Sequence, residues 1–390
     1  MSSSLVSRSP DLLRLRDEGF DLEIRSNYLL VHHVPYVTAE RTVAYGTLVS
    51  DLSHNGTSTI QPGEHTACLI GGIPHDDHGQ RLDRIINSPS QINLADGIVA
   101  DCQFSLKPPS GHYGDYHAKI TMYVGQLAGY ASVIDPAATA RTYPVYEVPE
   151  EESVFRYLDA MSGRARITAI SQKLAGARIG IVGVGGTGSY LLDLVAKTPV
   201  PEIHLFDGDR LFAHNAFRSP GAASLEQLRS EPMKADYYHG IYDAMHRHVI
   251  AHPYFVDESN VAELDAMGFV FVAVDSGPAK KLIVDRLEAA DVPFIEVGIG
   301  VYRSGDELGG TIRTTTSTPD RRTARSRIPF DETEDDYDGN IQIAELNALS
   351  AALAVMKWKK ICGFYADRER EHFSAYSIAS NKLFNEERPG

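Results

Sequence analysis

The sequence is poor in cysteine and contains no CxxC pair. Its three cysteines are Cys68, Cys102 and Cys362, far apart in a chain of 390 residues. A disulfide framework needs several paired cysteines, and cysteine zinc sites usually bring their ligands in CxxC pairs, so neither is supported. We therefore expect a protein of the reducing cytoplasm that folds without disulfides and without zinc.

Long hydrophobic runs and positive charge are also scarce. No window reaches the roughly 18 apolar residues of a membrane-spanning helix, and the serine-rich start lacks the apolar core of an export signal. The chain has 37 lysines and arginines against 52 aspartates and glutamates, a net charge of −15. This balance argues against nucleic acid and anionic membrane as main partners, so we expect a soluble protein that binds neither.

The chain is long and hydrophobic enough for more than one domain, with 390 residues of which 43% are hydrophobic. Its first part has β-rich runs broken by turn residues, which predicts a smaller α+β domain. A proline-containing, acidic segment at residues 136–152 is typical of a linker. We place the boundary near residue 148, so that residues 1–148 form an N-terminal module for docking a partner or substrate. The apolar runs behind this interpretation are residues 28–34, 42–49, 67–70 and 120–131.

Beyond the boundary, short apolar strands alternate with amphipathic helices. This alternation predicts an α/β domain over residues 149–390, with a Rossmann-like, doubly wound sheet covered on both faces. A polar segment at residues 311–339 carries runs of both charges and is expected to be a mobile loop. Helical periodicity returns at residues 340–365, where Leu346, Leu349 and Leu353 predict a packed or dimer-forming face. The expected strands are residues 178–184, 203–207, 252–256, 269–274 and 293–297, and the expected helices are 188–197, 234–245 and 278–290.

A glycine-rich motif separates the first of these strands from its helix. It consists of Gly183, Gly185, Gly186 and Gly188. Glycines at these positions allow a tight turn and let backbone amides approach a phosphate at the helix N-terminus. Taken alone, the motif fits a nicotinamide oxidoreductase as well as any other dinucleotide-binding protein.

Polar residues after the motif narrow the chemistry. A nicotinamide enzyme needs one acid for its ribose, but this chain offers several acids, an amide and two cations in sequence. Such a set suits a triphosphate and a metal ion. Its members are Asp207, Asp209, Asn215, Arg218, Lys234 and Asp275.

The order and spacing of these features resemble the ThiF/MoeB and ubiquitin-activating enzyme (HesA/MoeB/ThiF) family over about residues 150–390. A bacterial subgroup of that family carries an N-terminal domain of unknown function. The resemblance implies ATP-dependent adenylation of the C-terminal carboxylate of a small ubiquitin-like or sulfur-carrier-like protein, with release of pyrophosphate. It also implies a homodimer, because the family builds its sites at dimer interfaces and this chain has one such core.

The resemblance further implies roles for individual residues that bind the nucleotide. Asp207 would accept the ribose hydroxyls, and the glycine-loop amides would approach the phosphates. Asn215, Arg218 and Lys234 would bind the triphosphate, with both cations acting in catalysis.

The metal and the partner subunit are also assigned by resemblance. Asp275, helped by Asp209, would hold Mg²⁺. Arg164 would reach the γ-phosphate bound by the partner subunit, and Arg166 is the alternative for this role.

The chain departs from the family in its cysteines. The loop at residues 311–339 has no cysteine that could accept the acyl group as a thioester, and Cys362 is expected to be a small hydrophobic residue at a helix end. The adenylate would then be handed to another molecule. Alternatively, the N-terminal module is itself a conjugating-enzyme-like acceptor, for which Cys102 is a better candidate than Cys68 in its apolar run.

Two other functions remain open from the sequence. A non-catalytic adaptor would keep the nucleotide fold to bind a ubiquitin-like protein, but would not need the whole set of charged residues. A NAD-dependent oxidoreductase gives Asn215, Arg218, Lys234 and Asp275 no role.

Overall fold

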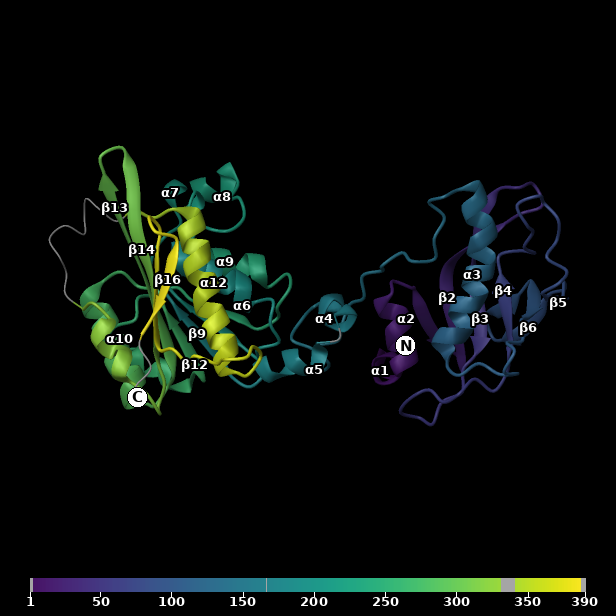
Figure 1. The fold of residues 1–390 in the computed structure, drawn as a ribbon, viewed down its shortest axis with the longest axis horizontal. Helices are drawn as coiled ribbons and strands as arrows, with labels where there is room; N and C mark the ends of the chain where they lie inside the picture. Colours follow the sequence, from purple (N-terminus) through teal and green to yellow (C-terminus); the bar gives the residue numbers. More distant parts are fainter. Residues whose placement is uncertain (1–2, 166, 331–340, 387–390) are drawn as a thin grey trace. The chain divides into compact units, whose positions relative to one another are not determined.

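The computed structural model describes residues 3–165, 167–330 and 341–386. The chain divides into two compact units, drawn in Figure 1. The first consists of Met1–Tyr146 and Asp159–Arg166, and the second of Glu147–Leu158 and Ile167–Gly390. The first unit thus ends its main stretch at Tyr146, close to the boundary placed near residue 148, and takes up residues 159–166 after the segment 147–158 of the second unit.

The first unit is the expected smaller α+β domain. Its six-stranded sheet has the order β1-β2-β3-β4-β8-β5. Helix α3 (Tyr116–Ile134) begins where the Asp115 side chain accepts a hydrogen bond from the amide of Ala118 at 2.7 Å, and it buries Ile120 and Tyr123 in the core. The other elements are α1 (Ser3–Arg8), α2 (Pro10–Asp17), β1 (Leu22–Arg25), β2 (Tyr28–Val37), β3 (Val43–Asp51), β4 (Thr66–Ile70), β5 (Ile86–Ser88), β6 (Ile92–Ala95), β7 (Ile98–Ala100), β8 (Cys102–Ser105) and α4 (Ala160–Arg164).

The second unit has the expected doubly wound sheet. Its eight strands have the order β11-β10-β9-β12-β13-β14-β15-β16. The strands from β11 to β13 are parallel, and those from β13 to β16 are antiparallel. Its strands are β9 (Ile179–Val182), β10 (Ile203–Phe206), β11 (Val249–His252), β12 (Phe269–Val272), β13 (Phe294–Ser304), β14 (Glu307–Ser317), β15 (Phe373–Ser377) and β16 (Lys382–Asn385).

Helices cover both faces of this sheet. Strand β9 is buried along its whole length, because Ile179 and Ile181 face α6 and α12 while Val182 packs in the cluster that contains α10. A strand buried on both faces reads as a continuous apolar run rather than an alternating one. The helices are α5 (Thr168–Ser171), η1 (Gln172–Leu174), α6 (Gly186–Val195), α7 (Ala213–Ala216), α8 (Leu225–Arg229), α9 (Lys234–Tyr242), η2 (Val261–Ala266), α10 (Gly277–Ala289), η3 (Thr323–Arg327) and α12 (Ala344–Ile361).

Two sequence-based expectations differ from the structure. The strand expected at residues 252–256 lies earlier, at β11, because Pro253 has no N–H to donate to a ladder and Val249 supplies the buried position. The expected loop at residues 311–339 begins with strand: β14 extends to Ser317, with buried, β-branched Ile312 and Thr315. Helix η3 follows, and residues 331–340 lie outside the described residues.

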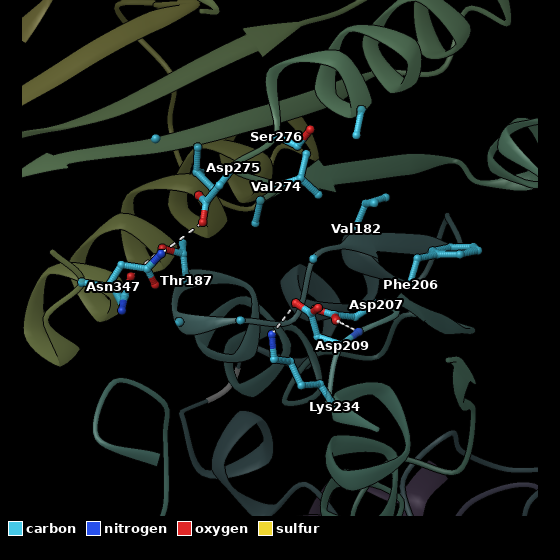
Figure 2. Close-up of a pocket in the computed structure, with 18 of the residues that line it drawn as sticks. Val182, Thr187, Phe206, Asp207, Asp209, Lys234, Val274, Asp275, Ser276 and Asn347 are labelled. Atoms are coloured by element: carbon cyan, nitrogen blue, oxygen red, sulfur yellow. Dashed lines mark hydrogen bonds and ion pairs between the residues drawn. The ribbon is translucent and has the colours of Figure 1, made fainter. Parts of the chain in front are cut away.

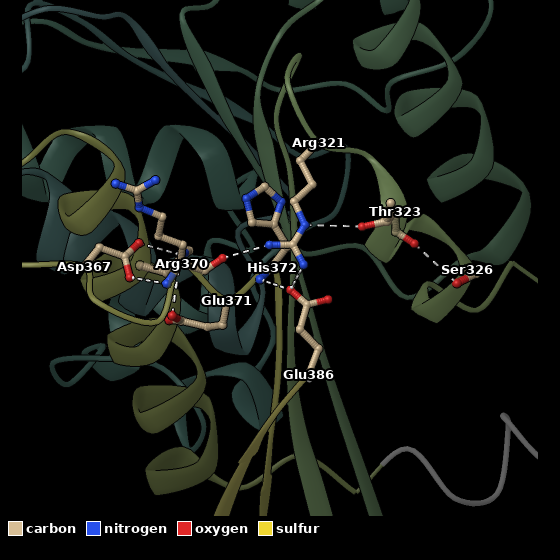
Figure 3. Close-up of polar contacts among 9 residues, drawn as sticks. Arg321, Thr323, Ser326, Asp367, Arg370, Glu371, His372 and Glu386 are labelled. Carbon is tan, nitrogen blue, oxygen red and sulfur yellow. Dashed lines mark hydrogen bonds and ion pairs between the residues drawn. The ribbon is translucent and has the colours of Figure 1, made fainter. Parts of the chain in front are cut away.

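The C-terminal hairpin β15–β16 is joined to the preceding segment by a polar cluster (Figure 3). Arg321 donates to the carboxylate of Glu386 at 2.8 Å and to the carbonyl of Arg370 at 3.0 Å. From α12, Lys360 donates to Glu371 at 2.9 Å. These contacts hold the end of the sheet against the segment after β14. In the described ranges, no helix is both long and apolar enough to span a membrane.

Candidate active site

A cavity of about 500 Å³ lies at the carboxyl ends of β9, β10 and β12 in the second unit (Figure 2). This is the edge of a doubly wound sheet at which ligands bind. The predicted site residues that line it are Gly183, Gly185, Gly186, Asp207, Asp209, Arg218, Lys234 and Asp275. Gly188 and Asn215 lie close by in sequence but do not line the cavity.

Three glycines of the motif line the cavity, and at two positions the packing of the backbone leaves no room for a side chain. Gly183 has a φ of +86°, and a Cβ there would collide with the carbonyl of Ala273. A Cβ on Gly188 would collide with the carbonyl of Gly183, whereas one on Gly185 would meet nothing within 4 Å. Helix α6 begins at Gly186, which lines the cavity, so its N-terminal amides and partial positive charge face an anion site.

Asp207 is fixed at the end of β10 by the backbone. One carboxylate oxygen accepts from the amide of Val184 at 2.7 Å, and the other accepts from the amide of Asp209 at 2.8 Å. Burial raises the pKa of Asp207, against the opposing effects of Lys234 and the two amides. The carboxylate is therefore held in one orientation beside the cavity, where it can still accept hydroxyl groups.

Lys234 and Asp209 form an ion pair on the cavity wall (Figure 2). The Nζ atom of Lys234 lies 2.7 Å from Oδ2 of Asp209, and the amide of Lys234 donates to the Asp209 carbonyl at 2.9 Å. The lysine is buried, while the aspartate side chain is 54% exposed. An entering phosphate could therefore replace Asp209 as the partner of the Lys234 ammonium, and the exposed Asp209 carboxylate would then be hydrated.

Asn215 and Arg218 carry buried donors that have no partner among the described residues. The Asn215 side-chain oxygen accepts from the amide of Phe212 at 2.8 Å, which places Asn215 in the first turn of α7. Its Nδ2 atom and the Nε atom of Arg218 are buried without a hydrogen bond. A buried unmade hydrogen bond costs about 1–3 kcal/mol. Both atoms are N–H donors, and Arg218 lines the cavity, so the site is suited to a phosphate-bearing ligand.

Three further residues of the cavity wall had not been predicted. Gln342 donates to the carboxylate of Asp275 at 3.2 Å. Asn347 accepts from the Thr187 hydroxyl at 2.9 Å and donates to the Arg218 carbonyl at 3.2 Å. All three line the cavity. Only the packing of α12 on α6 brings residues 342 and 347 to the glycine loop, and no local sequence pattern encodes it.

The carboxylates predicted to bind metal are in different settings. Both are exposed: Asp209 is paired with Lys234, and Asp275, which accepts a hydrogen bond from Gln342, lies on the far side of the cavity in Figure 2. Within the described residues, no three histidine, cysteine or acidic side chains gather as metal ligands. One carboxylate with phosphate oxygens and water is nevertheless a usual Mg²⁺ environment, which a carboxylate on the cavity wall fits.

The two arginines predicted for the partner subunit's nucleotide cannot be placed at the cavity. Arg164 is the last residue of α4 and its backbone belongs to the first unit. Its side chain and the whole of Arg166 lie outside the described residues. Their assignment remains a prediction.

The three cysteines are in settings unfavourable to a thiolate. Cys68 and Cys102 are buried in the first unit, and burial raises their thiol pKa values to about 11 and about 12. Cys362, half-buried after α12, has its pKa raised to about 11 for the same reason. Acceptor cysteines need a low pKa and exposure, so these environments give no support to a thioester.

Fold and cavity together are those of a nucleotide-binding α/β protein, with the ligand site at the carboxyl ends of a doubly wound sheet. The ThiF family matches residues 161–384, more than half of the chain, so the chain belongs to the ThiF family. Residues 10–160 match a domain of unknown function (DUF6791). No curated protein matches the chain.

Solved structures similar to the chain include PaaA and the Escherichia coli enzyme MccB. PaaA is 19% identical, with a TM-score of 0.45 over 56% of this chain and 75% of PaaA. MccB with ATP is 17% identical, with a TM-score of 0.46 over 56% of this chain and 65% of MccB. The chain thus spans just under two thirds of the length of MccB. At these values, the likenesses decide nothing about the substrate.

Proposed function

We propose that the protein adenylates the C-terminal carboxylate of a small ubiquitin-like or sulfur-carrier-like protein. One carboxylate oxygen forms a bond to the α-phosphorus of ATP, and the bond from that phosphorus to the bridging oxygen breaks. Pyrophosphate leaves with the electron pair. No general base is required, because a carboxylate is already ionised at neutral pH.

The main support is a set of donors at Arg218 in the cavity wall, at the N-terminus of α6, and at Asn215 just outside the wall. The buried Nε of Arg218 and Nδ2 of Asn215 have no partner among the described residues, and the N-terminus of α6 borders the same space. Arg218 would donate to phosphate oxygens, and Lys234 would exchange Asp209 for a phosphate. Charge on the phosphorus oxygens would then be stabilised where it develops.

The remaining residues orient the two substrates. Asp207, already held by two amides, would accept the ribose hydroxyls. Asp275 would hold Mg²⁺, which neutralises phosphate charge when bound. Gln342 reaches the same carboxylate and would keep it turned toward the cavity.

The finer parts of the proposal follow the family resemblance. They are a homodimer in which Arg164 or Arg166 completes the partner's site, a bacterial cytoplasmic setting, and an N-terminal module over residues 1–148 that docks the substrate or partner. Sedimentation of the full chain would test the dimer directly.

Pyrophosphate–ATP exchange tests the proposed reaction. The purified full chain is incubated with ATP, Mg²⁺, labelled pyrophosphate and a panel of ubiquitin-like proteins. We expect exchange that requires one of these proteins and is lost in Asp275→Ala. Asp306→Ala serves as the control, because Asp306 lies exposed at the tip of the β13–β14 hairpin. ATP binding without exchange for any partner would contradict the proposal and favour the adaptor.

A further inference from the structure

A group of three charged residues, of which Glu296 and Lys280 are buried and Arg313 is partly buried, lies behind the cavity wall. Glu296 on β13 is fully buried, and its Oε1 atom is 3.3 Å from Nζ of Lys280 on α10. The same oxygen is 3.3 Å from a terminal guanidinium nitrogen of Arg313 on β14. The lysine side chain is 7% exposed and the arginine side chain 27%. None of the three belongs to the sequence motifs that predicted the nucleotide site.

The charges of this group do not balance. Two cations meet one carboxylate, which leaves a net positive charge in a poorly hydrated place. The second oxygen of Glu296 and the Nε atom of Arg313 are buried and have no partner among the described residues. Buried charges are stable only when paired and hydrogen-bonded, so an additional anion at Arg313 would be favourable.

Gly298 connects this group to the cavity. It lines the cavity and stands opposite Arg313 in the β13–β14 ladder. A Cβ on Gly298 would collide with the Arg313 guanidinium. The Arg313 guanidinium therefore fills the space that a side chain at Gly298, a residue of the cavity wall, would occupy. Ala279, next to Lys280 on α10, lines the same cavity.

The sheet order separates Arg313 from the proposed phosphate ligands. Arg218 and Lys234 follow β10, whereas Arg313 is on β14, and β9, β12 and β13 lie between these two strands. The two sets of cations thus lie on opposite sides of the strands whose ends border the cavity, with Arg218 and Lys234 in the cavity wall and Arg313 behind Gly298 of that wall. An anion held at Arg313 would be a second substrate group beside the triphosphate.

We propose that Arg313 binds the carboxylate of the acyl substrate before this carboxylate attacks the α-phosphorus. The inference rests on the proposed function. Glu296 and Lys280 are positioning residues that hold the guanidinium over Gly298. An arginine that donates to one carboxylate oxygen leaves the other oxygen directed at phosphorus.

Calorimetry with two small probes tests the assignment on the full chain. Glycylglycine with a free carboxylate and glycylglycine amide are titrated in the presence of a non-hydrolysable ATP analogue. We expect the wild type to prefer the acid by roughly tenfold or more, the effect of a hydrogen bond to a charged group. Arg313→Met should lose this preference and Arg313→Lys should regain part of it. Arg303→Met is the matched control, since Arg303 is an exposed arginine on the same hairpin.

A second readout separates substrate binding from a structural role. In pyrophosphate exchange, Arg313→Met should raise the KM for the acyl substrate while the affinity for the ATP analogue stays unchanged. A parallel loss of analogue affinity would assign Arg313 to the fold instead. An acid preference that is absent in the wild type, or that survives in Arg313→Met, would overturn the inference while leaving ATP binding and the proposed function intact. Failure of the wild type to bind the analogue would contradict the proposed function itself.

Discussion

Lys119 and Lys234 make the same interaction in the two units of the chain. Each is a buried lysine whose ammonium meets one aspartate: Lys119 lies 2.8 Å from Asp51, and Lys234 lies 2.7 Å from Asp209. Lys119 is a buried residue of α3 in the first unit, whereas Lys234 lines the cavity of the second. An ion pair alone therefore does not define a site.

The neighbours of the two pairs differ. Near Lys119, the Asp11 carboxylate accepts from the amide of Tyr116 at 2.9 Å and from the hydroxyl of Thr59 at 2.6 Å. Near Lys234, buried donors of Asn215 and Arg218 have no partner in the part of the chain that the structure describes. Across the described residues, His75 is the one residue of the first unit with a buried unpartnered side-chain atom, and all others are in the second unit. A buried donor without a partner calls for an explanation such as a bound ligand, whereas satisfied polar groups do not.

The largest expected effect breaks the pair in the first unit. Asp51→Ala leaves the fully buried Lys119 without a counter-charge, which should lower the free energy of unfolding by roughly 3–5 kcal/mol. Lys119→Met should cost less, because the remaining Asp51 side chain is 33% exposed. Hydrogen exchange of the full chain would locate the loss in the first unit. Equal stability of wild type and Asp51→Ala would show that the pair is not structural.

The next effect breaks the pair in the second unit. Lys234→Met should lower pyrophosphate exchange by roughly 10²–10³-fold, as for a lost transition-state donor. The stability change should be small, because the abandoned Asp209 side chain is 54% exposed. Lys197→Met, which breaks an exposed pair with Asp193, is the control. Full exchange in Lys234→Met would refute the assigned role.

The sequence anticipated one side of the cavity better than the other. The predicted site residues from Gly183 to Lys234 are recognisable in the sequence, because they come after β9 and β10, whose carboxyl ends border the cavity. Gln342 and Asn347 reach it only through the packing of α12, and Arg313 lies behind Gly298 of the cavity wall only through the pairing of β14 with β13; residue types do not specify either. In α12, the apolar periodicity predicts a packed face at the leucines, which are half-buried, whereas the small residues Ala351 and Ala354 are fully buried.

A smaller expected effect is that the stability of the second unit depends on pH through a buried histidine. Burial lowers the pKa of His246, which is fully buried in the second unit and whose Nε2 lies 2.9 Å from the Val200 carbonyl. When the pH falls below about 6.5, the ordinary pKa of histidine, the unfolded chain binds a proton at this residue that the folded chain excludes. The free energy of unfolding therefore falls as the pH falls. For one histidine, the free energy of unfolding can fall by at most about 1.4 kcal/mol per pH unit. Hydrogen exchange between pH 7 and pH 5 should show the second unit opening, and His246→Gln should weaken this dependence. Unchanged protection there would contradict the sign.

The smallest expected effect concerns Cys362. Its half-buried thiol has a pKa raised to about 11, so Cys362→Ala should leave pyrophosphate exchange unchanged. Mass spectrometry after incubation with ATP and substrate should show no thioester on the wild type at this residue. A thioester that disappears in Cys362→Ala would give the second unit a catalytic cysteine.

Titration of ATP with Mg²⁺ into the full chain tests the central claim, that the unpartnered donors of the second unit bind a triphosphate. We predict that the wild type binds ATP, that Arg218→Ala weakens this binding by roughly tenfold or more, and that Asp51→Ala binds like the wild type at a temperature where it stays folded. NADH should not bind. Binding of NADH instead of ATP, or equal ATP affinity in Arg218→Ala, would contradict the account.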